Sequence, residues 1–111
     1  MEPLTLAQLQ SKVDAYIGQY EEGYFPPFEM LARLTEELGE LSREVQHVYG
    51  HVKKKQADHN SMDKEVGDLL FTLICFANAH DIRLEEALLQ VLHKFETRDK
   101  DRWTRKGESN D

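Results

Sequence analysis

Apolar residues recur along most of this chain at the three- and four-residue steps of an amphipathic α-helix. The clearest case is the segment 28–49, whose leucines and valines follow such steps without a break: Leu31, Leu34, Leu38, Leu41, Val45 and Val48. A stripe of this kind is typical of a helix that packs in a bundle. No segment shows the strict apolar and polar alternation that predicts a half-buried strand.

Helix start and stop signals divide the chain into four predicted helices. These cover residues 5–20, 28–49, 62–80 and 84–106. Gly23 and the pair Pro26–Pro27 separate the first two helices, because glycine often follows a helix end and proline suits a first turn. Ser61 is a suitable N-cap for the third. The sequence therefore predicts an all-α fold, with residues 1–111 forming one four-helix, bundle-like domain.

The third predicted helix carries more apolar surface than one small domain readily buries. The third is apolar nearly all round, which predicts burial in its own core or against another subunit. On the fourth, five residues are expected to face inward: Leu84, Leu88, Val91, Leu92 and Phe95. Self-association is expected from this excess. Residues 50–61, with three consecutive lysines and no apolar periodicity, are predicted to form an exposed loop.

Composition and charge narrow the class of protein. The chain has 111 residues, 40% hydrophobic and 32% charged, which suits a soluble helical globule with one core. Its net charge of −7 argues against broad binding of nucleic-acid polymers or acidic membranes. We find neither a membrane-span pattern nor a signal-peptide pattern. Cys75 is the only cysteine, so no disulfide framework is expected and a cytoplasmic location is predicted.

Two segments place acidic residues at three-residue steps beside apolar positions. The stretch EELGE supplies Glu36, Glu37 and Glu40, and the stretch EVGD supplies Glu65 and Asp68. On a helical wheel Glu37 lies at the edge of the leucine stripe with Glu40 beside it, whereas Glu36 points further outward. The other two acids lie on the predominantly apolar third helix. Acidic side chains are therefore expected at the margin of the core on two helices.

Buried carboxylates need a compensating positive charge. An unpaired one costs several kcal/mol or takes up a proton. Few basic residues are at hand, mainly Lys64 on the third helix and Arg33 on the second. One or two Mg²⁺ or Mn²⁺ ions would match four acids better, because both prefer carboxylate oxygens and keep positions open for water and phosphate. The alternative, ordinary charges on a helix surface, stays open above all for Glu36.

At these acids the sequence resembles the MazG-type nucleoside triphosphate pyrophosphohydrolases of the all-α NTP-pyrophosphatase superfamily. The family signature is EExxE, a spacer and then ExxD, matched here by Glu36, Glu37, Glu40, Glu65 and Asp68. The phrases LTEELGELSREV and DKEVGDLLFTLICFAN also match in their glycines and apolar positions, and the resemblance covers roughly residues 24–103. The chain departs from the family before the fourth helix, where Arg83 stands in place of a small or acidic residue.

The resemblance implies roles for particular residues. It assigns four Mg²⁺ ligands, Glu37, Glu40, Glu65 and Asp68, with Glu36 as an auxiliary acid. Lys94 and Arg98 match the family's K-x-x-x-R pair for phosphates, although spacing alone fits an exposed pair equally well. Asn78 would contact sugar or phosphate, or else cap the third helix. A homodimer or homotetramer with sites near subunit interfaces is also implied.

These residues lead to a functional hypothesis. The chain is expected to hydrolyse a nucleoside triphosphate to the monophosphate and pyrophosphate with Mg²⁺, or Mn²⁺ as an alternative, while Glu36 or Glu40 orients or deprotonates the attacking water. Four aromatic residues could stack on the base, although core or interface packing is their commoner use: Tyr24, Phe25, Phe28 and Trp103.

Two rival interpretations remain at this point. A di-iron bundle needs two Glu-x-x-His pairs, and Glu44 with His47 supplies only one. His47 and His51 stand four apart as zinc ligands can, but no third ligand completes a set, so both are expected at the surface. The second rival is a helical adaptor without enzymatic activity, which binds a partner through its apolar faces.

Overall fold

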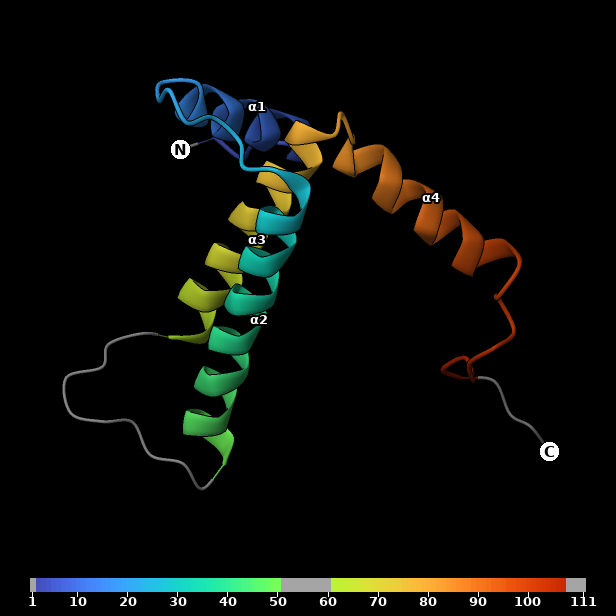
Figure 1. The fold of residues 1–111 in the computed structure, drawn as a ribbon. Coiled ribbons are helices and arrows are strands. Elements are labelled where there is room, and N and C mark those ends of the chain that lie inside the picture. The colour runs from blue at the N-terminus through green and yellow to red at the C-terminus, as the bar shows by residue number, and fades with distance from the viewer. Residues whose placement is uncertain (1, 51–60, 108–111) are drawn as a thin grey trace.

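The computed structural model describes residues 2–50 and 61–107, and in these the chain forms four α-helices and no strand (Figure 1). The helices are α1 (Leu6–Ile17), α2 (Pro27–Tyr49), α3 (Met62–Ala79) and α4 (Leu84–Thr97). The all-α prediction is confirmed. None of these helices has the length and apolar character that crossing a membrane requires. Apart from Gly50 and Ser61, the predicted loop with its lysine run lies outside the described residues.

Short-range signals fix where the helices begin. Thr5 and Gln8 form a capping box on α1, in which each side chain accepts a hydrogen bond from the other residue's backbone N–H. Pro27 opens α2. The Ser61 hydroxyl accepts a hydrogen bond from the Lys64 backbone N–H at the start of α3. All four predicted starts agree with the structure to within one residue.

Two helices end earlier than predicted. The first ends at Ile17 rather than at residue 20, and Gly18 is its C-cap. The second is α4, which ends at Thr97 rather than at residue 106. A helix depends on packing of an apolar face for most of its stability. In the stretch 98–106 the only large apolar side chain is Trp103, which is 76% exposed, so nothing there supports a longer helix.

The helices make an antiparallel pair with two additions at one end. Figure 1 shows α2 and α3 side by side, with α1 across the end where α2 begins and α3 finishes. The α2–α3 contact is the most extensive in the chain, and α1 also contacts α3 and α4. Asp81, with a φ of 56°, lies in the short turn after which α4 leads away from the pair.

The seam between α2 and α3 carries acidic residues at core positions. On α2 the most buried side chains are Met30 and Glu44, and Glu37 lies midway between them at steps of seven residues. Residues seven apart share one side of a helix. On α3 the most buried side chain on the seam is Glu65, which is 2% exposed. The prediction that the leucine stripe of α2 faces the core was therefore wrong in part: Leu31 and Leu38 are each 56% exposed.

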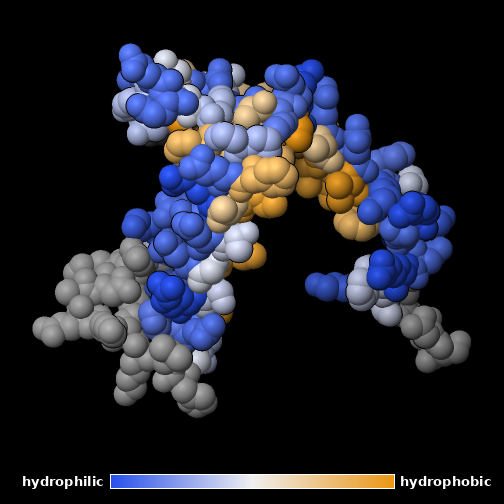
Figure 2. All heavy atoms as spheres, in the orientation of Figure 1, coloured by the Kyte–Doolittle hydropathy of each residue, from blue (hydrophilic) through white to orange (hydrophobic). Residues whose placement is uncertain are grey.

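Helix α4 does not close a bundle over α2 and α3 within one chain. Four of its five residues that were predicted to face inward are each more than 40% exposed: Leu88, Val91, Leu92 and Phe95. Figure 2 shows apolar side chains gathered on the inner side of the angle between the helix pair and α4. The radius of gyration is 18.4 Å. A compact chain of this length would have about 13 Å. The chain's own helices therefore leave much of its apolar surface uncovered.

A network of amide groups joins the middle of α1 to the end of α3 and the start of α4. The Gln10 side-chain N–H donates to the Asn78 side-chain oxygen at 3.0 Å and to the Ile82 carbonyl at 2.9 Å. Asn78 Nδ2 donates to the Gln10 carbonyl and to the Tyr24 hydroxyl, each at 3.0 Å. The Leu84 backbone N–H donates to Gln10 Oε1 at 2.9 Å. These bonds hold α1 against the end of α3 and the start of α4.

We expect Asn78→Ala to lower the free energy of unfolding by about 1–3 kcal/mol, because it leaves part-buried partners on α1 without their hydrogen bonds. Urea denaturation measures this loss. Gln90→Ala, at an exposed position of α4, is the matched control and should stay within about 0.5 kcal/mol of the wild type. Equal midpoints for the two variants would show that the network adds no stability.

Candidate metal centre

Four carboxylates from α2 and α3 converge across the seam. Glu37 and Glu40 come from α2, and Glu65 and Asp68 come from α3. Each offers one oxygen, and these oxygens all lie within 4.8 Å of one another. A three-residue step places both acids of each helix on the same side, and the antiparallel packing brings the two sides face to face. The structure thus brings together the four residues that were predicted as metal ligands.

The cluster is buried unevenly. The Glu65 side chain is 2% exposed, Glu37 and Asp68 are half-buried, and Glu40 is exposed. Within the described residues, one oxygen of Glu37 and one of Glu65 are buried without any hydrogen-bond partner. Buried polar atoms in native proteins are nearly always hydrogen-bonded, so such orphaned oxygens indicate that a positively charged group belongs beside them.

Burial and mutual repulsion raise the pKa of two of these carboxyl groups. Burial is the main cause for Glu65, and the charges of Glu40 and Asp68 add to it. The pKa of Glu37 is raised for the same reasons, and the charge of Arg33 opposes the rise. Without a cation, both groups therefore hold a proton more readily than an exposed carboxyl does. Either a proton or a cation relieves the repulsion.

The donor set fits a hard divalent cation. It consists of carboxylate oxygens alone, which suit Mg²⁺, Mn²⁺ or Ca²⁺ better than metals that prefer nitrogen or sulfur. The two orphaned oxygens are atoms that such an ion would satisfy. Glu37, Glu40, Glu65 and Asp68 would hold the ion between the two helices.

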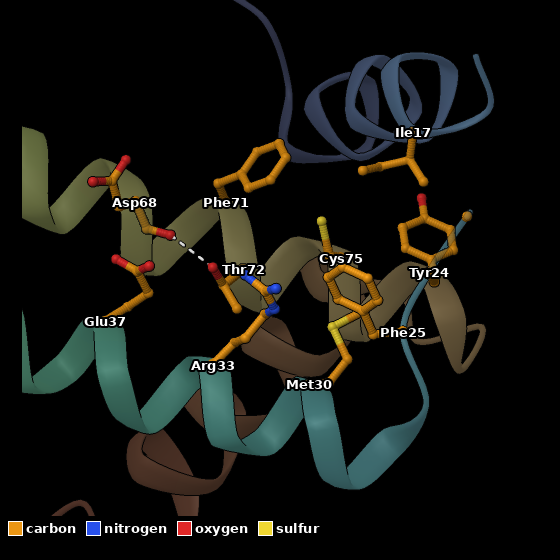
Figure 3. Close-up of a pocket in the computed structure, with 11 residues that line it drawn as sticks. Ile17, Tyr24, Phe25, Met30, Arg33, Glu37, Asp68, Phe71, Thr72 and Cys75 are labelled. Atoms are coloured by element: carbon orange, nitrogen blue, oxygen red, sulfur yellow. Dashed lines mark hydrogen bonds between the residues drawn. The ribbon is translucent and has the colours of Figure 1, made fainter. Parts of the chain in front are cut away.

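A cavity of about 320 Å³ adjoins the acidic cluster. This volume is within the range of small-molecule sites. Figure 3 shows Glu37 and Asp68 at one end, on opposite helices, with Thr72 beside them. The other end is largely apolar and is lined by Ile17, Tyr24, Phe25, Met30, Phe71 and Cys75. The arrangement offers a charged end and an apolar end to one ligand.

Two of the four aromatic candidates line this cavity. Tyr24 and Phe25 do so, whereas Phe28 and Trp103 are 88% and 76% exposed and do not. The Tyr24 hydroxyl donates to an Asp14 carboxylate oxygen at 2.7 Å and accepts the hydrogen bond from the Asn78 side chain. Burial and the nearby Asp14 raise the pKa of Tyr24 to about 12. Tyr24 therefore stays protonated and is held in place at the apolar end.

The predicted phosphate-binding pair lies elsewhere in the single chain. Lys94 Nζ is 4.9 Å from the centroid of the Phe95 ring, and Arg98 Nε is 3.6 Å from an Asp99 carboxylate oxygen. Both basic residues belong to the divergent end of α4, and neither lines the cavity. One chain alone does not bring them to the four acids.

Glu36 and Asn78 take positions beside the site rather than in it. Glu36 is exposed and stands outside the four-carboxylate cluster, although its charge contributes to the raised pKa of Glu37. Asn78 lies two residues before His80, the C-cap of α3, so the account of Asn78 as that cap was wrong. Its amide supports Tyr24, which lines the cavity.

Sequence reasoning missed a buried pair farther along α2. Glu44 is 4% exposed, and its carboxylate oxygen lies 3.7 Å from Nδ1 of His47, whose side chain is 10% exposed. The expectation that His47 lies at the surface was therefore wrong, and His51 lies outside the described residues. The seven-residue step from Glu37 to Glu44 was the available signal, because it repeats a seam position. Arg33, another lining residue, was noted only as a possible neutralising charge.

Comparison with known proteins identifies a family and several relatives of this chain. Residues 25–103 match the family model of the MazG nucleotide pyrophosphohydrolase domain. The protein YpjD of Bacillus subtilis (strain 168) is 61% identical over 109 residues, which are 97% of this chain and 98% of YpjD. The crystal structure of YpjD matches with a TM-score of 0.81 and 57% identity, over 88% of this chain and 99% of that one. The crystal structure of the Bacillus-conserved MazG protein, a nucleotide pyrophosphohydrolase, gives 0.78 and 53%, over 91% and 99%.

The raised carboxyl pKa values predict how stability changes with pH. Above the ordinary value of 4.5 the unfolded chain loses these protons before the folded chain does, so the metal-free protein becomes less stable as the pH rises through this window. In EDTA at pH 8, Glu65→Gln should therefore be more stable than the wild type by about 1–3 kcal/mol. This difference should vanish near pH 4.

Thermal melting from pH 4 to 8, with EDTA or with Mg²⁺, measures this pH dependence and the stabilisation by Mg²⁺. Mg²⁺ should raise the wild-type midpoint far more than that of Glu65→Gln. Glu96→Gln, at an exposed position of α4, is the control and should follow the wild type in both buffers. A Glu65→Gln variant that melts below the wild type in EDTA at pH 8 would contradict the account of repulsion at the seam.

Proposed function

The chain belongs to the MazG nucleotide pyrophosphohydrolase family, and we propose that it hydrolyses nucleoside triphosphates to nucleoside monophosphates and pyrophosphate with Mg²⁺ as cofactor. The observation that carries this proposal is the convergence of four carboxylates, two with orphaned buried oxygens, at one end of a cavity whose other end is apolar. Mn²⁺ is the alternative ion, since it takes the same oxygen ligands.

Each acid has a role in this proposal. When bound, the divalent ion supplies positive charge that stabilises the phosphates in the transition state. Glu37, Glu40, Glu65 and Asp68 hold it. Glu40 is also the most exposed of the four, and Glu36 lies one turn from it, so these two are placed to orient a water molecule and accept its proton. The water oxygen adds to one phosphorus of the α–β anhydride, the P–O bond of that phosphorus to the bridging oxygen breaks, and nucleoside monophosphate and pyrophosphate separate.

In this proposal the cavity binds the rest of the nucleotide, namely the base and the sugar. Its apolar end, with Tyr24 and Phe25, offers flat aromatic surface for a base. Asn78 acts as a positioning residue, because it donates a hydrogen bond to the Tyr24 hydroxyl. The substrate is a free nucleotide rather than a nucleic-acid polymer, in keeping with the net charge of −7. A cytoplasmic location suits the free, buried thiol of Cys75.

The proposed phosphate contacts of Lys94 and Arg98 need a second copy of the chain. In one chain, α4 diverges from the acids and leaves an apolar face uncovered. A homodimer or homotetramer would cover this face, and it would bring the basic pair of one copy to the acidic cluster of another. Charge complementarity supports this arrangement. Family membership also favours the enzyme over the adaptor considered from the sequence.

A panel of normal, deoxy and damaged nucleoside triphosphates, assayed for pyrophosphate with Mg²⁺ or Mn²⁺, tests the activity. Asp68→Asn should reduce kcat/KM by about 100-fold or more, because it weakens the hold on the cation that stabilises the transition state. Glu29→Gln, at an exposed position of α2, is the control and should retain wild-type rates. Absence of pyrophosphate from every nucleotide and ion would refute the proposal.

Mixing two inactive variants tests whether the site is shared between copies. Arg98→Met and Asp68→Asn, co-refolded in equal amounts, should recover about a quarter of the wild-type activity if the oligomer is a two-fold dimer, because half of the dimers then carry one intact site. Each variant alone, treated identically, is the control. Mixed oligomers that form, as seen by mass spectrometry, yet show no recovered activity would place both residues in the same chain's site.

A further inference from the structure

We infer that Arg33 is a substrate-binding residue that holds the α-phosphoryl group, at the point where the nucleoside joins the triphosphate. This inference rests on the proposed function, which it extends by assigning the segment of substrate between the base and the cation.

The position of Arg33 along α2 is the first observation. It lies one turn before Glu37, and its side chain lines the same cavity. Figure 3 shows Arg33 between Glu37 and the apolar end, with its guanidinium directed across the cavity towards Thr72 on α3. A ligand that reaches from the apolar end to the carboxylates has to pass this guanidinium.

The second observation is that no carboxylate of the described residues lies within ion-pair distance of this guanidinium, although its charge acts on the Glu37 carboxyl group. Among the ion pairs of the described residues, none involves Arg33. Its Cζ instead lies 4.4 Å from the centroid of the Phe25 ring, a cation–π contact that holds the guanidinium beside the cavity wall. The chain carries a net charge of −7 and has acids one turn away. Arg33 is exposed, and no ion pair or side-chain hydrogen bond within the described residues occupies its N–H donors, so they are available to an anionic ligand that enters the cavity.

The position of negative charge along the substrate indicates which group Arg33 contacts. With the base at the apolar end and the outer phosphates at the carboxylates through the cation, the segment between them is the sugar and the α-phosphoryl group. Only the latter is anionic, and the planar, forked guanidinium donates two parallel hydrogen bonds to such a group. Arg33 therefore stays with the monophosphate product, whereas Lys94 and Arg98 are assigned to the phosphates that leave.

Calorimetric titration with nucleoside monophosphates and with the matching nucleosides tests this assignment on the full-length protein. Arg33→Met should weaken monophosphate binding by about 10- to 100-fold and leave nucleoside binding unchanged. The kcat/KM for triphosphates should fall by a similar factor. Arg33→Lys should lie between the two, since it keeps the charge and loses the fork. Arg43→Met, an exposed arginine of the same helix outside the cavity, should match the wild type.

The outcomes separate this inference from the proposed function. The rise in melting temperature with Mg²⁺ should persist in Arg33→Met, which verifies its fold and acidic cluster. Monophosphate affinity equal to that of Arg43→Met would overturn the inference. So would an equal loss of nucleoside affinity, because Arg33 would then contact the base or shape its slot. Wild-type protein that hydrolyses no triphosphate would instead refute the proposed function, whatever the binding data show.

Discussion

Repulsion among carboxylates at the seam of α2 and α3 is the constraint on which this structure depends. Glu37 and Glu65 take positions where paired helices normally place apolar side chains. Their raised pKa values record the cost of that placement. A proton or a divalent cation removes the cost, so the helix pair reaches its most stable form only with positive charge at the seam. The close approach of carboxylates that lowers stability also gives the site its affinity for a cation.

Because acids occupy the middle of the seam, the stabilising apolar contacts lie elsewhere in the helix pair. Buried apolar side chains gather at the other end of the pair, as Met30, Ile74, Cys75 and Ala77. There the amide network of Gln10 and Asn78 adds α1 and the start of α4. The exposed apolar side chains of α3 and α4 remain for another copy of the chain to cover. The buried apolar side chains thus stabilise the end of the pair that also forms the apolar part of the cavity, through Met30 and Cys75.

Helix α2 sets the order of the groups that a nucleotide would meet. Met30 lines the apolar end, Arg33 follows, and Glu37 and Glu40 belong to the acidic cluster. At 1.5 Å of rise per residue, these positions span about 15 Å along one side of the helix. Because a helix is rigid, the spacing between base slot, arginine and cation site is fixed before a ligand binds. This rigidity favours one alignment of the α–β anhydride over others.

The sequence by itself determined the helix starts, the all-α class and the pairing of acids, because these depend on contacts within one or two turns. Thr5 and Ser61 cap their own helices, and a three-residue step places two carboxylates on one side whatever lies opposite. Only the tertiary structure decided that the seam follows Met30, Glu37 and Glu44 rather than the leucine stripe, that Arg33 borders the cavity, and that α4 turns away. Periodicity shows which residues share a face of a helix, but the neighbour that covers this face is set by packing between distant segments.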